Sequence, residues 1–217
     1  MPEATAAGAH PNRMSRQRQK TRERLIRAAL SVMAVKGVET ATINDITEAA
    51  DVGFGSFYNH FSSKEEILET ATLELFDRIG AKIDEAIGPI EDPCLALGTA
   101  VRMFVGILIS RRDWAQFIIR VSVIPGYKRL GMYARLFRDI HKIKVSNRLA
   151  IPDPDITTYA VGGALLFMIV ALLEGDLPEE GAGERMAATA LRMLGETDAR
   201  IREITAFPLP DHDLEAL

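Results

Sequence analysis

The stretch between Thr42 and Lys64 gathers hydroxyl, amide, imidazole and ammonium groups in a short length of chain. Asn59 carries an amide that donates and accepts at once, which matches the groups that adenine presents in the DNA major groove. The hydroxyl groups of Thr42 and Tyr58 and the ammonium group of Lys64 are of the kinds that bind phosphate. These residue types predict binding chemistry directed at nucleic acid.

A short helix is expected from about Phe54 to His60, and its faces follow from a step of about 100° per residue. Phe57 and Phe61 share one face, which must point into the core. Gly55 and Asn59 lie roughly 160° from Phe57, on the side turned outward into a groove. Asn59 is therefore the main candidate for reading bases, while Gly55 allows a close approach of the backbone.

The flanks of this helix are expected to meet the phosphate walls of the groove. Ser56 and Tyr58 fall about 100° to either side of the inward face, where their hydroxyl groups can reach phosphates. Phe54 and His60 are expected to sit half inward. Gly53, directly before the helix, completes the set of residues predicted to contact DNA.

Two helices must precede this segment and hold it in place. Apolar residues at steps of three and four between Ser15 and Lys36 predict an amphipathic first helix, which Gly37 ends. Thr42, with Asp45 three residues later, forms a variant of the capping box and starts a short second helix. The first two helices are thus predicted from local signals alone.

A fourth helix is expected to follow the short one. The segment 51–53 breaks the second helix, and Ser62 or Ser63, each followed three residues later by glutamate, caps a helix that continues towards Ile87. Short helices joined by tight turns after a longer basic helix predict a helix-turn-helix whose third helix enters the major groove.

Charge is distributed unevenly along the chain. The net charge is −4, yet the segment from Arg13 to Lys64 has nine Lys and Arg against five Asp and Glu, which gives +4 there and −8 elsewhere. One end of the molecule therefore suits phosphate. Arg16 and Arg18, with Lys20, are expected to follow the DNA backbone or the neighbouring minor groove.

The run from residue 42 to residue 65 resembles the signature of the TetR family of helix-turn-helix transcriptional regulators. In that signature a threonine-capped helix leads into V-S-x-G-x-x-Y-x-H-F-x-S-K-E, and this chain reads V-G-F-G-S-F-Y-N-H-F-S-S-K-E. The resemblance implies that Thr42, Tyr58, His60 and Lys64 contact phosphates while the third helix reads bases.

Two positions depart from the family pattern. Gly53 stands where the family commonly has serine, which removes one candidate phosphate contact. Asp51 stands before Val52, where the usual spacing places glycine, so a less standard turn is expected.

The rest of the chain is expected to be helical, which makes the fold class all-α. Long apolar segments alternate with Pro and Gly breakers, and no segment alternates with period two. We expect an arm over residues 1–12, a helix-turn-helix domain over 13–63 and a helical domain over 64–217, with the helix from 64 to about 87 connecting them. The resemblance implies that this second domain has about six helices, binds a ligand and dimerises.

The segment 156–173 carries no charge. A membrane span is one interpretation of this segment, but glycines dilute its hydrophobicity and acidic residues flank both ends, so a span is not expected. A monomer of this size cannot cover such a helix on every side, so we expect a second copy of the chain to cover it, and no membrane partner. On this helix and on a second one near 185–194, the expected dimer interface comprises Tyr159, Gly162, Gly163, Leu166, Val170, Met186, Ala190, Met193 and Leu194.

A pocket for a small apolar effector is expected in the second domain, although each of its candidates also suits an ordinary core position. The apolar candidates are Met103, Phe104, Ile107, Trp114, Phe117, Ile118, Val121, Phe167 and Met168. Arg120 interrupts this apolar run, and either pairs with an anionic ligand or forms a salt bridge at the edge of its helix.

Together these patterns favour a ligand-released repressor that acts as a homodimer on palindromic double-stranded operator DNA. An activator, or a ligand-independent DNA-binding protein on the same scaffold, is the alternative. An enzyme is not expected, because the sequence has no Gly-rich phosphate loop, no G-x-S-x-G and only scattered histidines. No cofactor or metal is expected, and the single cysteine and the absence of an apolar leader favour the cytoplasm.

Overall fold

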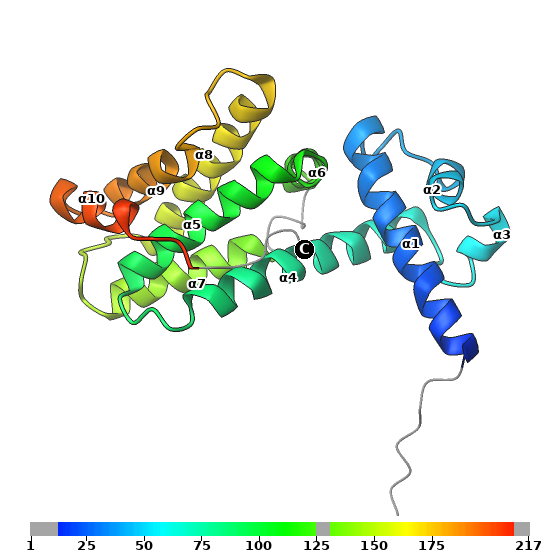
Figure 1. The fold of residues 1–217 in the computed structure, drawn as a ribbon, viewed down its shortest axis with the longest axis horizontal. Coiled ribbons are helices and arrows are strands. Elements are labelled where there is room, and N and C mark those ends of the chain that lie inside the picture. Colours follow the sequence, from blue (N-terminus) through cyan, green and yellow to red (C-terminus); the bar gives the residue numbers. More distant parts are fainter. Residues whose placement is uncertain (1–12, 125–130, 211–217) are drawn as a thin grey trace, which may run out of the picture.

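Every regular element that the computed structural model describes, over residues 13–124 and 131–210, is a helix, which confirms the all-α class. The helices form two lobes joined by one long helix (Figure 1). Their bounds are α1 Arg13–Lys36, α2 Ile43–Ala49, α3 Phe54–Phe57, α4 Lys64–Ile87, α5 Pro93–Ser110, α6 Arg112–Ser122, α7 Met132–Val145, α8 Pro154–Glu174, α9 Ala182–Met193 and α10 Asp198–Ala206. The expected arm at 1–12 lies outside the described residues.

The first lobe contains α1, α2, α3 and the start of α4 (Figure 1). Its core is closed by fully buried Leu25 and Met33 of α1, together with Ile46 of α2 and Phe57 of α3. α1 ends where predicted, because Gly37 has a φ of 94° and so takes the left-handed conformation that glycine adopts without steric cost. The apolar spacing of α1 thus becomes the inner face of a three-helix lobe.

Two predicted caps set the starts of α2 and α4. The Thr42 hydroxyl accepts a hydrogen bond from the Asp45 amide, and the Asp45 carboxylate accepts one from the Thr42 amide at 3.0 Å. The Ser63 hydroxyl likewise accepts from the Glu66 amide at 3.2 Å. These bonds satisfy amides that have no partner within the helix, which confirms the capping box at α2 and selects Ser63 at α4.

The third helix is shorter than expected. It spans four residues, Phe54–Phe57, and Tyr58 is already its C-cap. The amide of Asn59 bonds the carbonyl oxygen of Ser56, and the amide of His60 bonds that of Phe57. These bonds span three residues rather than four, so the chain tightens into a turn before His60.

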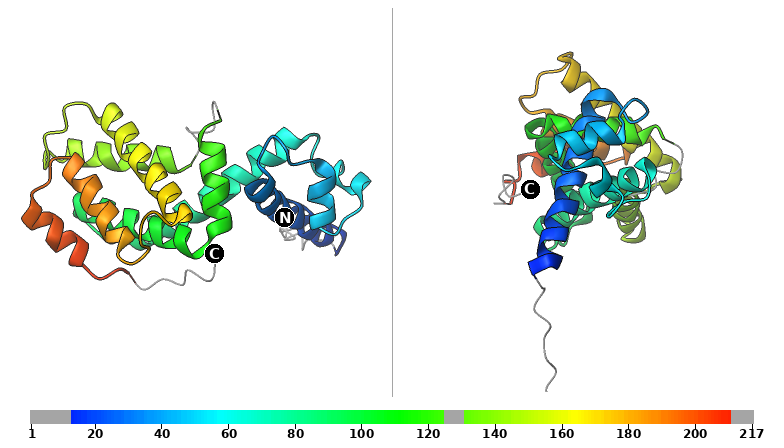
Figure 2. Two further views of the ribbon diagram at one scale, coloured as in Figure 1. Left: turned by 90° about the horizontal axis from the view of Figure 1, so that it is seen from above. Right: turned by 90° about the vertical axis from the view of Figure 1, so that its right-hand side faces the viewer.

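α4 connects the lobes. With 24 residues it is about 36 Å long, and its buried stripe passes from the first lobe into the second. Viewed from above, the lobes stand at opposite ends of α4, and α6 lies at the boundary between them (Figure 2). α6 packs extensively against α1, so the second lobe contacts the first through α6 as well as through α4.

The second lobe is built around α5, which packs against α4, α6, α7, α8, α9 and α10. Two helices, α5 and α8, are long and apolar enough to cross a bilayer. Most of α5 is buried inside the lobe, as is typical of a core helix. By contrast, only 28% of the apolar stretch of α8 is buried. α8 therefore carries an apolar face that packing within the lobe does not cover.

Candidate DNA-binding surface and ligand cavity

The exposed end of the first lobe is formed by α3 and the turn that follows it. Phe57 and Phe61 are buried, as predicted, and Gly55 and Asn59 are exposed. Tyr58 is 53% exposed and stacks edge-on against Phe57, with ring centroids 5.4 Å apart. The buried aromatic pair thus fixes a turn that presents a phenol and an amide to solvent.

The remaining residues of this turn lie partly as predicted. Ser56 and His60 are half-buried, whereas Phe54 is 51% exposed, so the expectation that Phe54 sits half inward is wrong. The reason is that Phe54 opens α3, directly after exposed Gly53, and its ring contacts Tyr58 rather than the core. Phe54 therefore adds apolar surface beside the phenol.

His60 lies near two positively charged residues, Arg18 and Arg22. Partial burial lowers the pKa of His60, and the charges of Arg18 and Arg22 lower it further. Because the ordinary value is already about 6.5, the imidazole is neutral at pH 7 in the free protein. A phosphate placed near His60 would favour the charged form.

The arginines of α1 divide into two groups. Arg16 and Arg18 are exposed. Arg18 also donates to the carbonyl oxygen of Asn59 at 3.1 Å, which connects α1 to the exposed turn after α3. Arg22 instead pairs with Glu74 at 2.6 Å, and Arg24 donates to the carbonyl oxygen of Asp51 at 2.8 Å. Part of the basic charge of α1 thus holds the lobe together.

Lys64 has a structural partner that the sequence does not reveal. Its ammonium group donates to the carbonyl oxygens of Val38, Glu39 and Ala41 at 3.1, 3.0 and 3.1 Å. An ammonium group has three donors, and all three are used here. In the free protein Lys64 thus binds the turn between α1 and α2, and its phosphate contact stays a prediction.

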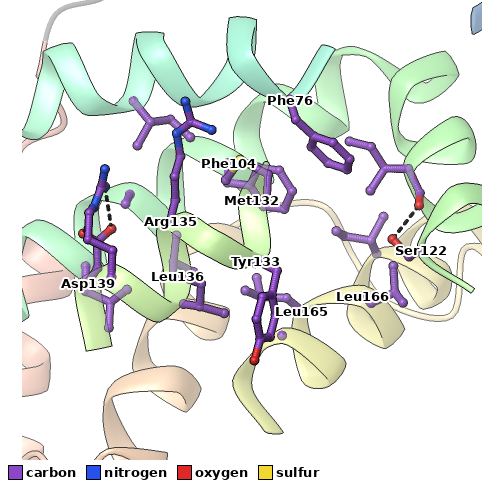
Figure 3. Close-up of a pocket in the computed structure, with 18 of the residues that line it drawn as sticks. Phe76, Phe104, Ser122, Met132, Tyr133, Arg135, Leu136, Asp139, Leu165 and Leu166 are labelled. Carbon is purple, nitrogen blue, oxygen red and sulfur yellow. Dashed lines mark hydrogen bonds and ion pairs between the residues drawn. The ribbon is translucent and has the colours of Figure 1, made fainter. Parts of the chain in front are cut away.

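A cavity of about 270 Å³ lies among α4, α5, α6, α7 and α8 (Figure 3). Most of its lining is apolar, with Phe76 of α4, Phe104 of α5 and Met132 of α7 around one side. Tyr133 of α7 and Tyr159 of α8 face each other with ring centroids 4.8 Å apart. Aromatic and aliphatic walls of this kind suit a flat, apolar ligand.

One end of the cavity carries four charged side chains, which we call the charged quartet: Asp84, Arg135, Arg138 and Asp139. Arg135 donates to the Asp84 carboxylate at 3.1 Å, and Arg138 donates to the other oxygen of Asp84 at 2.7 Å. Arg138 also bonds Asp139 at 2.8 and 3.1 Å. The four groups form one hydrogen-bonded chain between α4 and α7.

The quartet is ionised. Burial alone raises the pKa of Asp84, but hydrogen bonds from Arg138 and Arg135 outweigh burial and hold the pKa below its usual range. Hydrogen bonds to Asp139 and Asp84 raise the pKa of Arg138. The cavity therefore offers fixed carboxylate acceptors and guanidinium donors beside apolar walls.

Ten residues were expected to line a pocket, and three of them, Phe104, Ile118 and Val121, line this cavity. The others lie elsewhere: Met103, Ile107, Trp114 and Phe117 are buried core residues, Met168 packs against the core, Phe167 is 76% exposed, and Arg120 bonds the end of α1. The apolar stripe of a helix is wide enough to serve both the core and a cavity, so periodicity could not separate the two.

The quartet was missed by sequence reasoning. Arg135, Arg138 and Asp139 recur at steps of three and four along α7, in a segment that otherwise alternates with apolar residues. That spacing places them on one helix face and was the available signal. Asp84 lies about fifty residues earlier, on α4, and only the fold brings it to the same place.

Arg120 does not face the cavity. Its guanidinium donates to the carbonyl oxygens of Ala34 at 2.9 Å and Val35 at 3.3 Å, at the C-terminal end of α1. Both alternatives considered from the sequence, an anion partner and a salt bridge, are thereby corrected. The true partner is backbone, which a sequence pattern cannot indicate.

The expected interface residues divide by helix. On α8, Tyr159 and Gly163 are exposed, and Gly162, Leu166 and Val170 are half-buried. On α9, Met193 is exposed, whereas the side chains expected beside it face inward because α9 packs its apolar stripe against α5. Those three inward residues, Met186, Ala190 and Leu194, are therefore removed from the expected interface.

The single cysteine, Cys94, is buried and unpaired with another cysteine. Burial raises the pKa of the Cys94 thiol to about 12, so the thiol stays protonated at neutral pH and is a poor nucleophile. Within the described ranges, no three His, Cys, Asp or Glu side chains gather as a metal site requires.

Comparisons with known proteins bear on both lobes. The model of bacterial regulatory proteins of the tetR family matches residues 25–80. The model of the tetracyclin repressor-like C-terminal domain matches residues 92–206, more than half of the chain. The chain belongs to the TetR family. It is accordingly a DNA-binding transcriptional regulator, with a helix-turn-helix lobe and a helical C-terminal lobe.

Solved structures of TetR-family proteins share the whole fold. A structure of RolR in complex with the ligand resorcinol is 30% identical, covers 91% of this chain and 98% of its own, and superposes with a TM-score of 0.70. RolR without ligand is 31% identical, covers 87% of this chain and 98% of its own, and gives a TM-score of 0.66.

Two curated relatives match over part of the chain. The regulator TcmR from Streptomyces glaucescens is 33% identical over 97 residues, which is 44% of this chain and 42% of the relative. The repressor KstR2 from Mycolicibacterium smegmatis is 34% identical over 74 residues, 32% of this chain and 36% of the relative. The matches thus span less than half the length of these relatives.

Proposed function

We propose that this TetR-family protein is a repressor that binds a palindromic operator as a homodimer and is released by a small molecule. The observation that carries the proposal is the cavity with its charged quartet, placed in the lobe that contacts the helix-turn-helix through α4 and α6. The quartet places ionised donors and acceptors at one end of an apolar cavity, which supports the binding of a small ligand that carries polar groups. Binding to cytoplasmic DNA is part of the same proposal.

The operator is read by the exposed turn after α3 in this proposal. Asn59 contacts a base edge in the major groove, and Tyr58 and Thr42 hold phosphates on its flanks. Arg16 and Arg18 extend the contact along the neighbouring backbone. The remaining contacts come from Gly53, Phe54, Gly55, Ser56 and His60.

The homodimer forms through α8. Ile156, Tyr159, Gly163 and Phe167 recur at steps of three and four, and Ile156 and Phe167 are 65% and 76% exposed. A continuous apolar stripe of this kind on a lobe surface is a typical protein interface, because its burial removes apolar area from water. Two copies related by a two-fold axis place two recognition turns at half-sites about one helical turn apart.

The effector is a small aromatic compound with hydroxyl groups. A cavity of about 270 Å³ exceeds the engineered cavity of about 150 Å³ that holds benzene, so one ring fits with room for substituents. The quartet supplies the acceptors and donors that two hydroxyl groups require. RolR, which has the same fold, has been solved with resorcinol, a compound of this class.

The operator proposal is tested by selecting binders from random duplexes and titrating the best one. We expect an inverted repeat, loss of specificity with Asn59→Ala, and uniform weakening with Tyr58→Phe. Arg202→Ala, an exposed arginine on α10, is the matched control and should bind as the parent does. Enrichment of no inverted repeat at moderate salt would contradict the proposal.

The effector proposal is tested by calorimetric titration with resorcinol, phenol and benzene. We expect the affinity to fall in that order, because each lost hydroxyl group removes hydrogen bonds between the ligand and the charged quartet. Asp139→Asn should weaken resorcinol binding, whereas Asp113→Asn, an exposed aspartate on α6, should not. Equal affinity for all three probes, or binding of none, would exclude a hydroxylated aromatic effector.

A further inference from the structure

The turn between α1 and α2 is held from two directions. We use the name α1–α2 turn for residues 34–41. Arg120 of α6 donates to the carbonyl oxygens of Ala34 and Val35. Lys64 of α4 donates to the carbonyl oxygens of three residues later in the turn, over 38–41. Five backbone oxygens of one short segment are thus bound by two cations from different helices.

These contacts are of a strong kind. The last carbonyl groups of a helix have no partner within the helix and carry partial negative charge. Hydrogen bonds from a charged donor are shorter and stronger than neutral ones. Gly37 makes room for the guanidinium, since a Cβ atom built there would lie 3.1 Å from an Arg120 nitrogen. The end of α1 is therefore shaped to receive Arg120.

The two helices that supply these cations also line the ligand cavity. On α6, Ile118, Val121 and Ser122 line the cavity, and Arg120 stands between them in sequence. On α4, the lining includes Phe76 and Asp84. A rigid helix of 11 residues with one face on the cavity transmits a displacement of that face to its other side chains.

The α1–α2 turn leads directly into the DNA-binding elements. Ala41 is followed by Thr42, the N-cap of α2, and Lys36 at the end of α1 pairs with Asp45 of the same cap at 2.6 Å. A shift of the turn therefore changes the start of α2, which packs against α3. Arg120 of α6, which bonds α1, thus lies on the path from the cavity wall to the exposed turn after α3.

We propose that Arg120 is the positioning residue that couples the cavity to the helix-turn-helix. When the cavity is filled, α6 shifts and Arg120 draws the end of α1 with it, while Lys64 keeps the later part of the turn attached to α4. The turn is then pulled between two anchors, and α2 and α3 change their orientation. This inference rests on the proposed function and names the residue through which that function is regulated.

The experiment follows amide hydrogen exchange in the α1–α2 turn of the full chain. The cavity is filled in two ways, with resorcinol and with Ala100→Leu, a substitution in the cavity wall on α5. In the parent protein, each filled state should change the exchange rates of the turn about fivefold or more, which is the lower range of measured coupling between sites. The second way needs no ligand.

Three variants decide the role of Arg120. Arg120→Ala should fold, bind the selected operator, and show no change in the turn when Ala100→Leu is added. Arg120→Lys, which keeps a cationic donor, should restore part of the response. Arg112→Ala is the matched control, because Arg112 lies on the same helix but pairs with Glu179 in the second lobe. This control should respond as the parent does.

The outcomes separate the coupling from the effector. If Ala100→Leu changes the turn but resorcinol does not, the effector class is wrong and the coupling stands. If Ala100→Leu changes the turn equally with and without the Arg120 guanidinium, or leaves the parent turn unchanged, the coupling proposal is overturned. If Arg120→Ala does not fold, Arg120→Lys decides: a smaller response of the turn than in the parent supports the coupling, and a response as large as that of the parent overturns it.

Discussion

His60 lies at the edge of the exposed turn, where burial and two arginines keep its imidazole neutral. A phosphate bound nearby reverses that balance, because a negative charge favours the protonated ring and raises its pKa. The complex then holds more protons than the free protein. By linkage, operator affinity must rise as the pH falls through the interval between the two pKa values.

We therefore expect tighter operator binding at about pH 6 than at about pH 8, measured by fluorescence anisotropy at constant ionic strength, since phosphate binding depends strongly on salt. His60→Gln should remove most of this slope. His141→Gln, on α7 of the other lobe, is the control and should retain it. An unchanged slope in His60→Gln would show that another group takes up the proton.

Thr99 offers a test of stability at a single atom. Its hydroxyl oxygen is buried and has no hydrogen-bond partner in the part of the chain that the structure describes. Thr99→Val keeps the shape and removes the unpaired group, so the free energy of unfolding should rise by about 1 kcal/mol. Thr72 is equally buried, but its hydroxyl donates to Leu68 at 2.7 Å. Thr72→Val should therefore lower the free energy of unfolding. Urea titrations of the two variants and the parent measure both effects.

Single residues also mark the limit of prediction from sequence. Asn59 was predicted on the outward side and Tyr58 on a flank, and both are exposed, because the buried Phe57 and Phe61 fix the inward side. Arg120 was expected to pair with an anionic ligand or to form a salt bridge, and Lys64 to contact phosphate, but in the free protein both donate to backbone oxygens. Every residue offers a carbonyl oxygen, so a sequence holds no signal for which one a cation will reach.

Between elements, the contact of α4 with α7 depends on one missing side chain. A Cβ atom built on Gly80 would lie 2.1 Å from the guanidinium carbon of Arg135. Gly80→Ala must therefore displace that guanidinium, which is the flexible end of its side chain. The displaced group can no longer hold Asp84 in the observed geometry.

For Gly80→Ala we expect resorcinol affinity to fall about tenfold, equivalent to about 1.4 kcal/mol, while the unfolding midpoint changes little. Gly106→Ala on α5 is the control, since no atom lies within 4 Å of the added Cβ atom. Titration calorimetry and thermal unfolding give the two readouts. A large loss of stability with unchanged affinity would mean that α4 and α7 separate as whole helices instead.

The starts of α2 and α4 were predictable because caps are local, with the bonding groups three residues apart. The length of α3 was not, since its last turn tightens under the packing of Phe57 and Phe61. On α9, the apolar stripe through Met186 and Ala190 predicted a buried face correctly. Its partner proved to be α5 of the same chain. The apolar stripe of a helix thus predicts that one face of the helix is buried, but it does not predict which element buries that face.

For the whole molecule, the proposed dimer depends on the apolar stripe on α8. In the proposed dimer, Phe167→Glu places an unpaired carboxylate in the interface, which costs several kcal/mol and should weaken dimerisation at least about 100-fold. Analytical ultracentrifugation should then show monomers that bind the operator poorly. Val145→Glu, at an exposed position on α7, is the control and should leave the dimer intact. A Phe167→Glu protein that stays dimeric would place the interface elsewhere.

The position of the helix-turn-helix along the chain was predictable from charge and periodicity, because the short helices follow directly after the basic first helix. The position of the cavity was not. It arises where α4, α7 and α8 meet, and its polar end joins Asp84 to arginines about fifty residues later. Only tertiary packing brings such distant groups together.

Tyr159, Gly162, Gly163 and Leu166 belong both to the cavity wall and to the half of α8 that bears the proposed subunit contact. In a two-fold dimer, each cavity is then separated from the other subunit by the thickness of one helix. An effector that moves the α8 wall of the cavity in one subunit should also move the α8 wall of the cavity in the other subunit. The effector titration of the dimer should therefore depart from a simple hyperbola, and its Hill coefficient would report how strongly one occupied cavity affects its empty counterpart.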